Sequence, residues 1–522
     1  MTNPRFFKWL FSWRTVRRLL VGIACLVTLW ALFCTEEDIR GKHAWDSYRR
    51  NVGARGENLD FQAFIPKSVP DDQNFAATPF IRSWFVRNNH VFRLVWKGDN
   101  YGQAEAHTTV PGARVYASPR NFLDLVAWSR AFDVIRAGKM TGSQNFVSGK
   151  LDLEFRAKAA PSVLEGLKTN DAAFAELRAA SQRPFSRYPI EYDLDNPSAI
   201  LLPHLINVRQ GCRRLMLKAS AELVAGQSQD ALEDVKLALF MADSLKEEPF
   251  IISYLVRVAC LLSANQPVWE GLAEHAWSDT QLQELETRLQ QGDLVSDAKR
   301  SLESERACGV TTIELVRKKG LGYLGDLGSD TPSPPLPADH SVANFIGLFV
   351  PRGWYYLEKY NYCRLFDTLL GSGIDATKKR ISPGQLASGR REFDLQFNGG
   401  RASNIFHHRF MSAMLLPAVE KFVGKATQAQ TIANQAAVAC ALERYRLADG
   451  QFPDALDALV PRFISQLPHD VITGEPYKYR RSADGQFVLY SVGWNEKDDG
   501  GVPGKTLFDE EEGDWVWRYP SP

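Results

Sequence analysis

The sequence predicts a mainly α-helical protein with a transmembrane helix near its N-terminus, helical hairpins in its centre and a small α+β module at its C-terminus. Three observations lead to this fold class. Residues 19–35 carry no charge, the centre repeats apolar residues at helical spacing, and the C-terminal part changes to short strand-like runs. Apolar residues make up 45% of the 522 residues and charged residues 24%, which is typical of a folded protein rather than a disordered one.

The charge balance argues against a nucleic-acid partner. The 62 Lys and Arg residues almost cancel the 61 Asp and Glu residues, which gives a formal net charge of +1. Binding to nucleic acid depends on many cations that neutralise phosphates, and such proteins usually carry a clear positive excess. We therefore expect no nucleic-acid binding.

Residues 19–35 are predicted to cross a lipid bilayer once. At a rise of about 1.5 Å per residue they span about 26 Å, slightly less than a hydrocarbon core of about 30 Å. Acidic residues follow at positions 36–38, whereas the preceding segment has only basic ones: Arg5, Lys8, Arg14, Arg17 and Arg18. By the positive-inside rule, this places the N-terminus in the cytoplasm and the bulk of the chain outside the inner membrane.

Two alternatives to an uncleaved anchor remain open. A cleaved signal peptide usually has an apolar region of about 7–15 residues followed by small residues, which Leu32-Phe33-Cys34 does not supply. Cys25 follows a small residue, as in lipidated proteins, but it lies too early in the apolar segment. A buried helix of a soluble protein is the third interpretation.

Changes in composition and the positions of Pro and Gly divide the chain into six regions. A Pro- and Gly-rich stretch, which cannot form a packed helix or a central strand, separates two helical regions. The predicted regions are a cytoplasmic stub and anchor (1–35), a mixed, partly irregular region (36–200), helical hairpins (201–320), a linker or long loop (321–343), a second helical region (344–425) and the α+β module (426–522).

The central region has the clearest helical pattern. Helices are predicted at 206–225, 230–245 and 251–264, the first ending at Gly226 and the last interrupted by Pro267. Short turns between them predict antiparallel hairpins. One hairpin resembles a tetratricopeptide-type repeat, but no second copy follows at a period near 34 residues. Ser278 and Gln281 form the pattern of a capping box before a further helix.

The C-terminal module is predicted to be a long helix followed by an antiparallel hairpin. Apolar residues in 427–447 fall on one helical face, and Gly450 ends the helix. A short second helix follows at 456–461. Strands are predicted at 477–480 and 486–492, joined through Asp484-Gly485, because Asp-Gly accommodates the positive φ of a tight turn.

Residues 427–501 resemble the globular domain of the major pseudopilin of type II secretion. The likeness rests on the order of the helix, Gly450-Gln451-Phe452-Pro453, Gly474-Glu475-Pro476-Tyr477 and Tyr490-Ser491-Val492-Gly493. It implies a pseudopilin-like helix packed on an antiparallel sheet. No pseudopilin processing motif precedes the module, so the resemblance does not extend to filament formation.

The whole chain also resembles a family of membrane-anchored, exported bacterial proteins that has no assigned role. Three segments carry this resemblance: 183–190, 266–272 and 513–520. The likeness implies a membrane anchor and an extracytoplasmic compartment, and it implies no reaction.

The pseudopilin resemblance implies a calcium site in the loop after the second predicted strand. Calcium binds several converging oxygen ligands, and the matching positions supply the Val492 carbonyl and the side chains of Asn495, Asp498, Asp499 and Asp514. The first matched side chain is Asn where Asp is usual in that family. The alternative is a solvated acidic turn without an ion.

No catalytic motif is recognisable in the sequence. It has no Gly-x-Ser-x-Gly elbow, His-Glu-x-x-His pair, phosphate-binding loop or dinucleotide fingerprint. Adjacent residues of a helix point in different directions, so His407 and His408 cannot bind one metal ion there. We predict a surface or helix-start pair at these positions.

These observations favour a non-enzymatic interaction or scaffold protein, anchored in the membrane and working outside the cytoplasm with a protein partner in the envelope. One alternative is an accessory of a type II secretion or pilus-like apparatus. Another is an extracytoplasmic hydrolase or sugar-binding protein with a site around the aromatic segment 354–362. A deep pocket with a perturbed acid at that segment would favour the last alternative.

Overall fold

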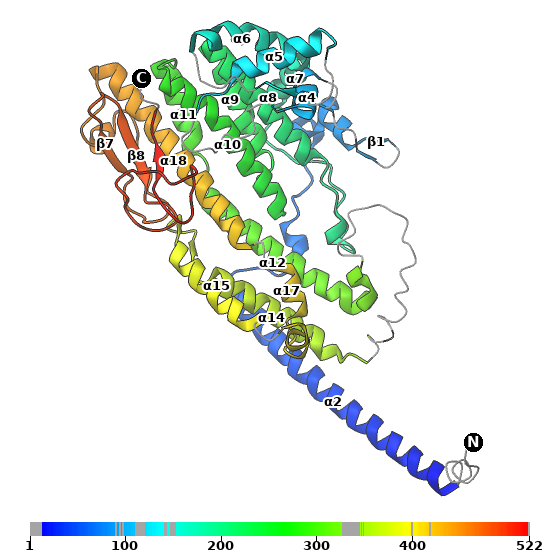
Figure 1. The fold of residues 1–522 in the computed structure, drawn as a ribbon. Helices are drawn as coiled ribbons and strands as arrows, with labels where there is room; N and C mark the ends of the chain where they lie inside the picture. The colour runs from blue at the N-terminus through cyan, green and yellow to red at the C-terminus, as the bar shows by residue number, and fades with distance from the viewer. Residues whose placement is uncertain are drawn as a thin grey trace.

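The protein is mainly helical, with an N-terminal apolar helix that extends away from the body (Figure 1). The structure is a computed structural model. It describes residues 13–88, 91–92, 95–96, 99–109, 121–139, 144–146, 153–325, 345, 347, 349–397, 400–416 and 419–519. The predicted linker is described only as far as the 3-10 helix η7 (Leu321–Gly325), and the rest of it lies outside these residues.

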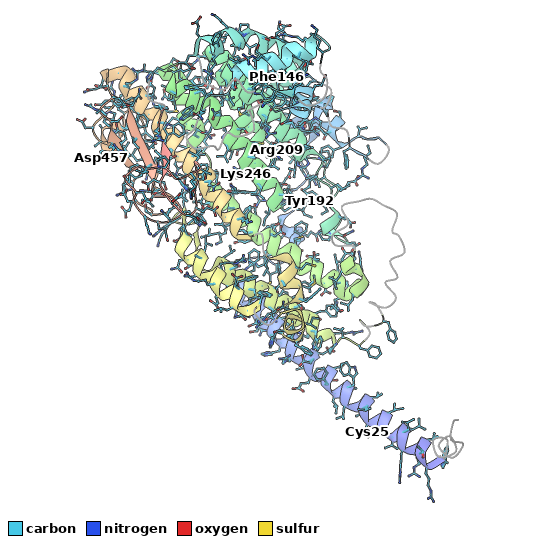
Figure 2. The ribbon with its side chains drawn as sticks, viewed as in Figure 1. Cys25, Phe146, Tyr192, Arg209, Lys246 and Asp457 are labelled. Carbon is cyan, nitrogen blue, oxygen red and sulfur yellow. The ribbon has the colours of Figure 1, made fainter. Side chains whose placement is uncertain are left out.

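Helix α2 (Trp13–Ala54) contains the predicted membrane segment and continues well beyond it into the body. Its apolar side chains from Leu19 to Phe33 are exposed, and Figure 2 shows the part around Cys25 standing clear of the body. Two described helices are long and apolar enough to cross a membrane, and the other one is mostly buried. The N-terminal apolar helix could therefore span a bilayer.

Polar groups in the apolar part of α2 are satisfied within the helix itself. The hydroxyl of Thr28 donates to the carbonyl oxygen of Ala24, and that of Thr35 donates to the carbonyl oxygen of Ala31, both at 2.8 Å. Such internal hydrogen bonds suit a segment surrounded by hydrocarbon, where no water can accept the proton.

The region before the central hairpins consists mostly of short elements, some of which pack into the main core, while α4, α5 and α6 form a smaller core with α8. Trp128 and Phe132 of α5 pack there against α6 and α8. The elements are η1 (Phe61–Phe64), η2 (Asp71–Gln73), η3 (Phe75–Ala77), α3 (Pro79–Arg82), η4 (Ser83–Phe85), β1 (Arg87–Asn88), β2 (Val91–Phe92), α4 (Asn100–His107), β3 (Thr108–Thr109), α5 (Leu125–Arg136), β4 (Gln144–Asn145), α6 (Leu153–Leu167), η5 (Lys168–Asn170), α7 (Asp171–Ala180) and η6 (Pro197–Ala199).

The predicted central helices are present, and the first three pack on one another, whereas the fourth packs mainly on the later helix α18 (Val419–Asp449) and the fifth on α14 (Arg352–Leu370) and α18. The five central helices are α8 (His204–Val224), α9 (Ser228–Asp243), α10 (Ile251–Ala273), α11 (Asp279–Gln290) and α12 (Leu294–Lys319). The capping box at the start of α11 is confirmed, because the Ser278 hydroxyl accepts from the Gln281 N–H and the Gln281 side chain accepts from the Ser278 N–H.

The predicted break at Pro267 is wrong. Helix α10 continues through Pro267 to Ala273. Proline removes one backbone hydrogen bond, which usually ends a helix. Here, however, residues 262–272 are all buried, and packing on α8, α9 and α18 outweighs the local preference.

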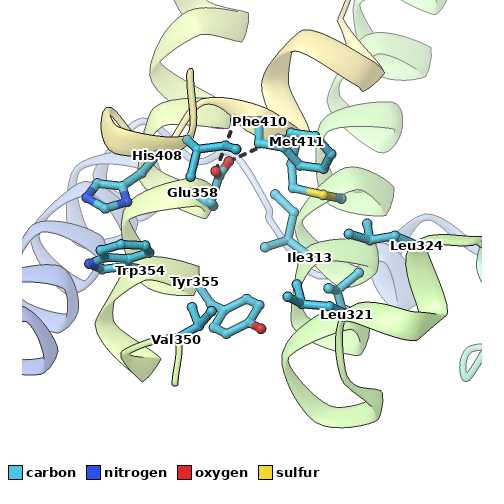
Figure 3. A pocket seen from close by; sticks show the side chains of 12 residues that line it. Ile313, Leu321, Leu324, Val350, Trp354, Tyr355, Glu358, His408, Phe410 and Met411 are labelled. Atoms are coloured by element: carbon cyan, nitrogen blue, oxygen red, sulfur yellow. Dashed lines mark hydrogen bonds between the residues drawn. The ribbon is translucent and has the colours of Figure 1, made fainter. Parts of the chain in front are cut away.

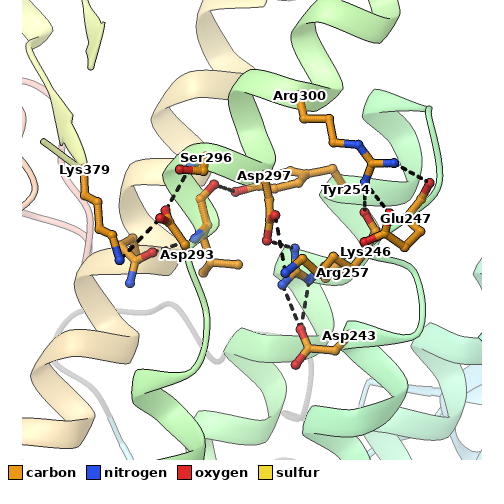
Figure 4. Close-up of polar contacts among 12 residues, drawn as sticks. Asp243, Lys246, Glu247, Tyr254, Arg257, Asp293, Ser296, Asp297, Arg300 and Lys379 are labelled. Atoms are coloured by element: carbon orange, nitrogen blue, oxygen red, sulfur yellow. Dashed lines mark hydrogen bonds and ion pairs between the residues drawn. The ribbon is translucent and has the colours of Figure 1, made fainter. Parts of the chain in front are cut away.

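A buried arginine joins three of the central helices (Figure 4). Arg257 of α10 donates to Asp243 of α9 and to Asp297 of α12, each at 2.8 Å. Arg288 of α11 also donates to Asp243, at 2.5 Å. Burial alone would raise the pKa of Asp243, but the two guanidinium groups hold it below its usual range. The ion pairs of Arg257 and Arg288 thus fix α9, α10, α11 and α12 relative to one another.

The second helical region surrounds the point where α2 joins the body (Figure 1). It consists of α14 (Arg352–Leu370), the short antiparallel pair β5 (Ile374–Asp375) and β6 (Arg380–Ile381), α15 (Pro383–Phe397), α16 (Gly400–Phe406) and α17 (Phe410–Leu415). Helices α2 and α14 run side by side, and the Tyr48 hydroxyl donates to the Asp367 carboxylate at 2.7 Å.

The C-terminal module is a long helix beside an antiparallel sheet. Helix α18 (Val419–Asp449) is followed by the 3-10 helix η8 (Leu456–Leu459) and by the strands β7 (Lys478–Arg481), β8 (Phe487–Ser491) and β9 (Trp515–Trp517), in the order β7-β8-β9. The predicted hairpin is confirmed, with Gly485 at φ 79°. The third strand, β9, was not predicted, and it pairs Trp515 with Ser491.

Candidate functional site

The apolar helix α2 meets α14 at a close crossing of two glycines. A side chain on Gly353 would overlap the Glu37 carbonyl, and one on Gly41 would overlap the Gly353 carbonyl. The Gly353 N–H donates to Asp38 Oδ1 at 2.5 Å, and the Trp354 indole donates to Glu37 Oε2 at 3.1 Å. The first turn of α14 is thereby fixed to α2 only two residues after the end of the apolar segment.

A cavity of about 360 Å³ lies directly behind this crossing (Figure 3). Pockets that hold small molecules usually measure about 300–1,000 Å³ and are mostly apolar. This pocket is formed between α12, η7, the start of α14 and the turn from α16 to α17. Its lining is almost entirely apolar or aromatic, with Ile313, Val316, Leu321, Leu324, Tyr355 and Met411 among its members.

Among the described residues that line this pocket, Glu358 carries the one carboxyl group. Its two oxygens accept the backbone N–H groups of Phe410 at 3.0 Å and Met411 at 3.2 Å, as Figure 3 shows. Burial raises the pKa of Glu358 to about 7, although these two hydrogen bonds favour the ionised form. The carboxyl group therefore caps the first amides of α17 and changes its charge near neutral pH.

His408 lies beside Trp354 at the edge of the pocket, with 4.9 Å between the ring centroids. The predicted surface or helix-start pair lies in the turn before α17, where His407 is exposed, but a surface position is wrong for His408, which is only 8% exposed. Burial lowers its pKa to about 4, although Glu37 lies 3.9 Å from its Nε2. Near neutral pH the imidazole is uncharged and matches the apolar surroundings.

Exposed apolar side chains continue from the pocket onto the surface. Ile405 and Phe410 line the pocket and are 48% and 42% exposed, and Phe406 between them is 73% exposed. Phe345 and Phe349, which precede α14 and contact each other, are 62% and 55% exposed. We call these five residues the apolar rim. Exposed apolar groups that adjoin one another commonly mark a binding surface.

A pocket with a perturbed acid does lie at the segment 354–362, which is the observation predicted to favour a hydrolase or sugar-binding site. Hydrolysis of a glycosidic bond usually requires two carboxyl groups about 5–10 Å apart, and the described lining supplies Glu358. A sugar also needs several polar partners, whereas the lining is apolar. An apolar ligand would bury both surfaces without leaving polar groups unpaired.

The predicted calcium ligands come from two segments, the loop after β8 and the residue before β9, and their four side chains all make hydrogen bonds within the protein. Asp514 accepts the backbone N–H groups of Asp499 at 3.2 Å and Gly501 at 2.6 Å. Asn495 donates to the Asp499 carboxylate, and Asp498 accepts from the Tyr490 hydroxyl at 3.0 Å.

The electrostatics of this loop are mixed. Burial raises the pKa of Asp514, and the nearby Asp499 and Asp498 raise it further, as expected where carboxylates approach one another. Over the part of the chain that the structure describes, no group of three or more His, Cys, Asp or Glu side chains has the geometry of a metal site. Calcium binding by Val492, Asn495, Asp498, Asp499 and Asp514 stays a prediction.

The apolar pocket was only partly visible in the sequence. The aromatic segment 354–362 was singled out, and it supplies Trp354, Tyr355 and Glu358. The other walls come from residues about 40 positions earlier and 50 positions later, and no local pattern connects them. The apolar residues Ile405, Phe406 and Phe410 on either side of His407 and His408 are the signal that could have pointed to the second wall.

Comparisons with known protein families, with curated proteins and with solved structures each found no match. The site is therefore argued from its own geometry.

Proposed function

We propose that the chain is a membrane-anchored binding protein of the bacterial envelope and that its pocket beside α2 takes an apolar ligand. The observation that carries this proposal is the pocket itself: an apolar cavity of ligand size, adjoining exposed apolar residues, at the base of an exposed apolar helix. In this account α2 crosses the inner membrane once, with the N-terminus in the cytoplasm and the body outside.

The charges around α2 support this orientation. Basic residues precede the apolar segment, and acidic residues at 36–38 follow it. Two of these, Glu37 and Asp38, accept hydrogen bonds from the first turn of α14. The body therefore begins directly where the apolar segment ends, which is consistent with a body that rests on the outer surface of the membrane.

Native mass spectrometry of the full-length protein tests the ligand class. When the protein is released from detergent in the presence of palmitic acid, it should retain one bound molecule of the acid. Leu321 is a half-buried residue of the pocket wall. Leu321→Trp should fill the pocket and abolish this binding. Leu201→Trp, which changes a leucine that is 53% exposed and not among the pocket-lining residues, should not. Equal retention by both variants, or no retention by the wild type, would contradict the proposal.

A second candidate function is an accessory role in a type II secretion or pilus-like apparatus. It is supported by the order of elements at the C-terminus, where α18 is followed by the antiparallel strands β7, β8 and β9, as the pseudopilin resemblance implies. Deletion of the gene should change the set of exported proteins, and affinity capture from detergent extracts should recover components of such an apparatus. An unchanged secretome would count against it.

A further inference from the structure

We propose that the ligand of the pocket is an acyl chain of a phospholipid from the outer leaflet of the same membrane that α2 crosses. This inference rests on the proposed function and names its ligand. It follows from where the pocket lies relative to α2, from the side chains around its mouth and from the charges at the level of the lipid headgroups.

The pocket lies at the height of the membrane surface. The apolar segment of α2 ends at Thr35, and Glu37 is about 3 Å further along the helix axis at 1.5 Å per residue. Glu37 accepts from the indole of Trp354, which lines the pocket, and lies 3.9 Å from the imidazole of His408, which also lines it. An acyl chain could therefore enter without leaving the immediate neighbourhood of the bilayer.

The apolar rim faces the same zone. Phe345 and Phe349 directly precede the first turn of α14, which contacts α2 at Gly41. Ile405, Phe406 and Phe410 flank the turn that places His408 against Trp354. In water these five exposed apolar side chains are unfavourable, whereas at a bilayer surface they would be covered by lipid. Ile405 and Phe410, which also line the cavity, would guide a chain into it.

Aromatic and basic residues of this part of the protein suit the two parts of a phospholipid, its acyl chains and its charged headgroup. Trp354 and Tyr355 line the pocket, and Trp and Tyr are enriched where hydrocarbon meets headgroups. Arg40 pairs with Glu37 at 2.7 Å, whereas Lys42 and Arg352 are exposed on the neighbouring turns of α2 and α14. The charges of Lys42 and Arg352 would attract the phosphate of a lipid whose chain occupies the pocket. A free apolar molecule would make no use of them.

The test places full-length protein in nanodiscs of a phospholipid that carries a diazirine near the end of one acyl chain. After irradiation, mass spectrometry locates the lipid adducts. Residues 19–35 must be labelled by any bilayer lipid, so they serve as an internal standard. We expect additional adducts on pocket peptides from α12, α14 and α17. In Leu321→Trp these should fall by about fivefold or more relative to the standard, while Leu201→Trp keeps them.

The outcomes separate this inference from the function on which it rests. Adducts confined to residues 19–35 would overturn the inference. If palmitic acid still binds in native mass spectrometry, the pocket takes free apolar molecules and the proposed function stands. If palmitic acid also fails to bind, both fall. A separate experiment with a bifunctional cross-linker tests a further occupant, residues 326–344 of the chain itself. Cross-links from these residues to the pocket, together with an absence of lipid adducts there, would overturn both proposals.

Discussion

Gly41 and Gly353 bring the backbones of α2 and α14 into direct contact. A methyl group on Gly353 would overlap main-chain atoms of Glu37 and Asp38, and one on Gly41 would overlap those of Gly353. The close approach allows the Gly353 N–H to reach Asp38 and the Trp354 indole to reach Glu37. The attachment of the body to the apolar helix thus depends on two residues without side chains.

The first prediction concerns this crossing. Gly353→Ala should destabilise the protein by about 1–3 kcal/mol, because an added methyl group in a closely packed contact forces the backbones apart. Thermal unfolding followed by circular dichroism measures the effect. Gly53→Ala, in the partner helix α2 and with open space around it, is the matched control and should be neutral or slightly stabilising. Similar unfolding temperatures for the two variants would show that the crossing is loose.

The second prediction concerns the buried arginine of the central helices. Arg257→Ala removes the partner that Asp243 and Asp297 share, and breaking a buried charge pair typically destabilises by about 3–5 kcal/mol. Because Asp243 keeps its pair with Arg288, we expect the lower end of this range. Arg300→Ala removes an exposed pair with Glu247 and should change stability by no more than about 0.5 kcal/mol. Denaturant unfolding of the two variants compares them. A small effect of Arg257→Ala would mean that the helices pack without the ion pairs.

The third prediction is a pH dependence that originates at Glu358. Burial raises its pKa to about 7 from a usual value near 4.5, so the folded protein binds this proton more tightly than the unfolded chain does. Lowering the pH from 8 to 5 should therefore stabilise the wild type relative to Glu358→Gln, by an amount on the order of 1–3 kcal/mol. Parallel thermal melts across this range measure the difference. A difference that does not change with pH would place the pKa at its ordinary value.

The fourth prediction addresses the acidic loop. If the pseudopilin resemblance extends to metal binding, millimolar calcium should raise the unfolding temperature of the full chain and release heat in a calorimetric titration. Asp499→Asn should remove both effects, and magnesium should not reproduce them. Identical melts with calcium and with a chelator would identify the loop as a solvated turn held by Asp514.

Local sequence signals predicted individual elements well and their assembly poorly. The capping box at Ser278, the end of α18 before Gly450 and the turn at Gly485 depend on neighbouring residues alone, and all three are present. Pro267 was misjudged because burial of its helix on several sides outweighs a local preference. Strand β9 was missed because only its pairing with β8 makes it a strand.

The candidate site shows the same limit. Trp354 and Glu358 lie in a segment that the sequence singled out, but the raised pKa of Glu358 arises from burial by residues far away along the chain. The buried position of His408 follows from its contact with Trp354, which sequence spacing does not encode. Distances between segments, and not residue types, define this pocket.

The account depends most on which side of the membrane holds the body. Two C-terminal fusions, one to alkaline phosphatase and one to green fluorescent protein, measure this directly in bacterial cells. Phosphatase is active only outside the cytoplasm. The fluorescent protein fluoresces in the cytoplasm and stays dark when the general pathway exports it. We predict an active phosphatase fusion and a dark fluorescent one. A fluorescent fusion with an inactive phosphatase would place the body and its pocket in the cytoplasm and contradict the account.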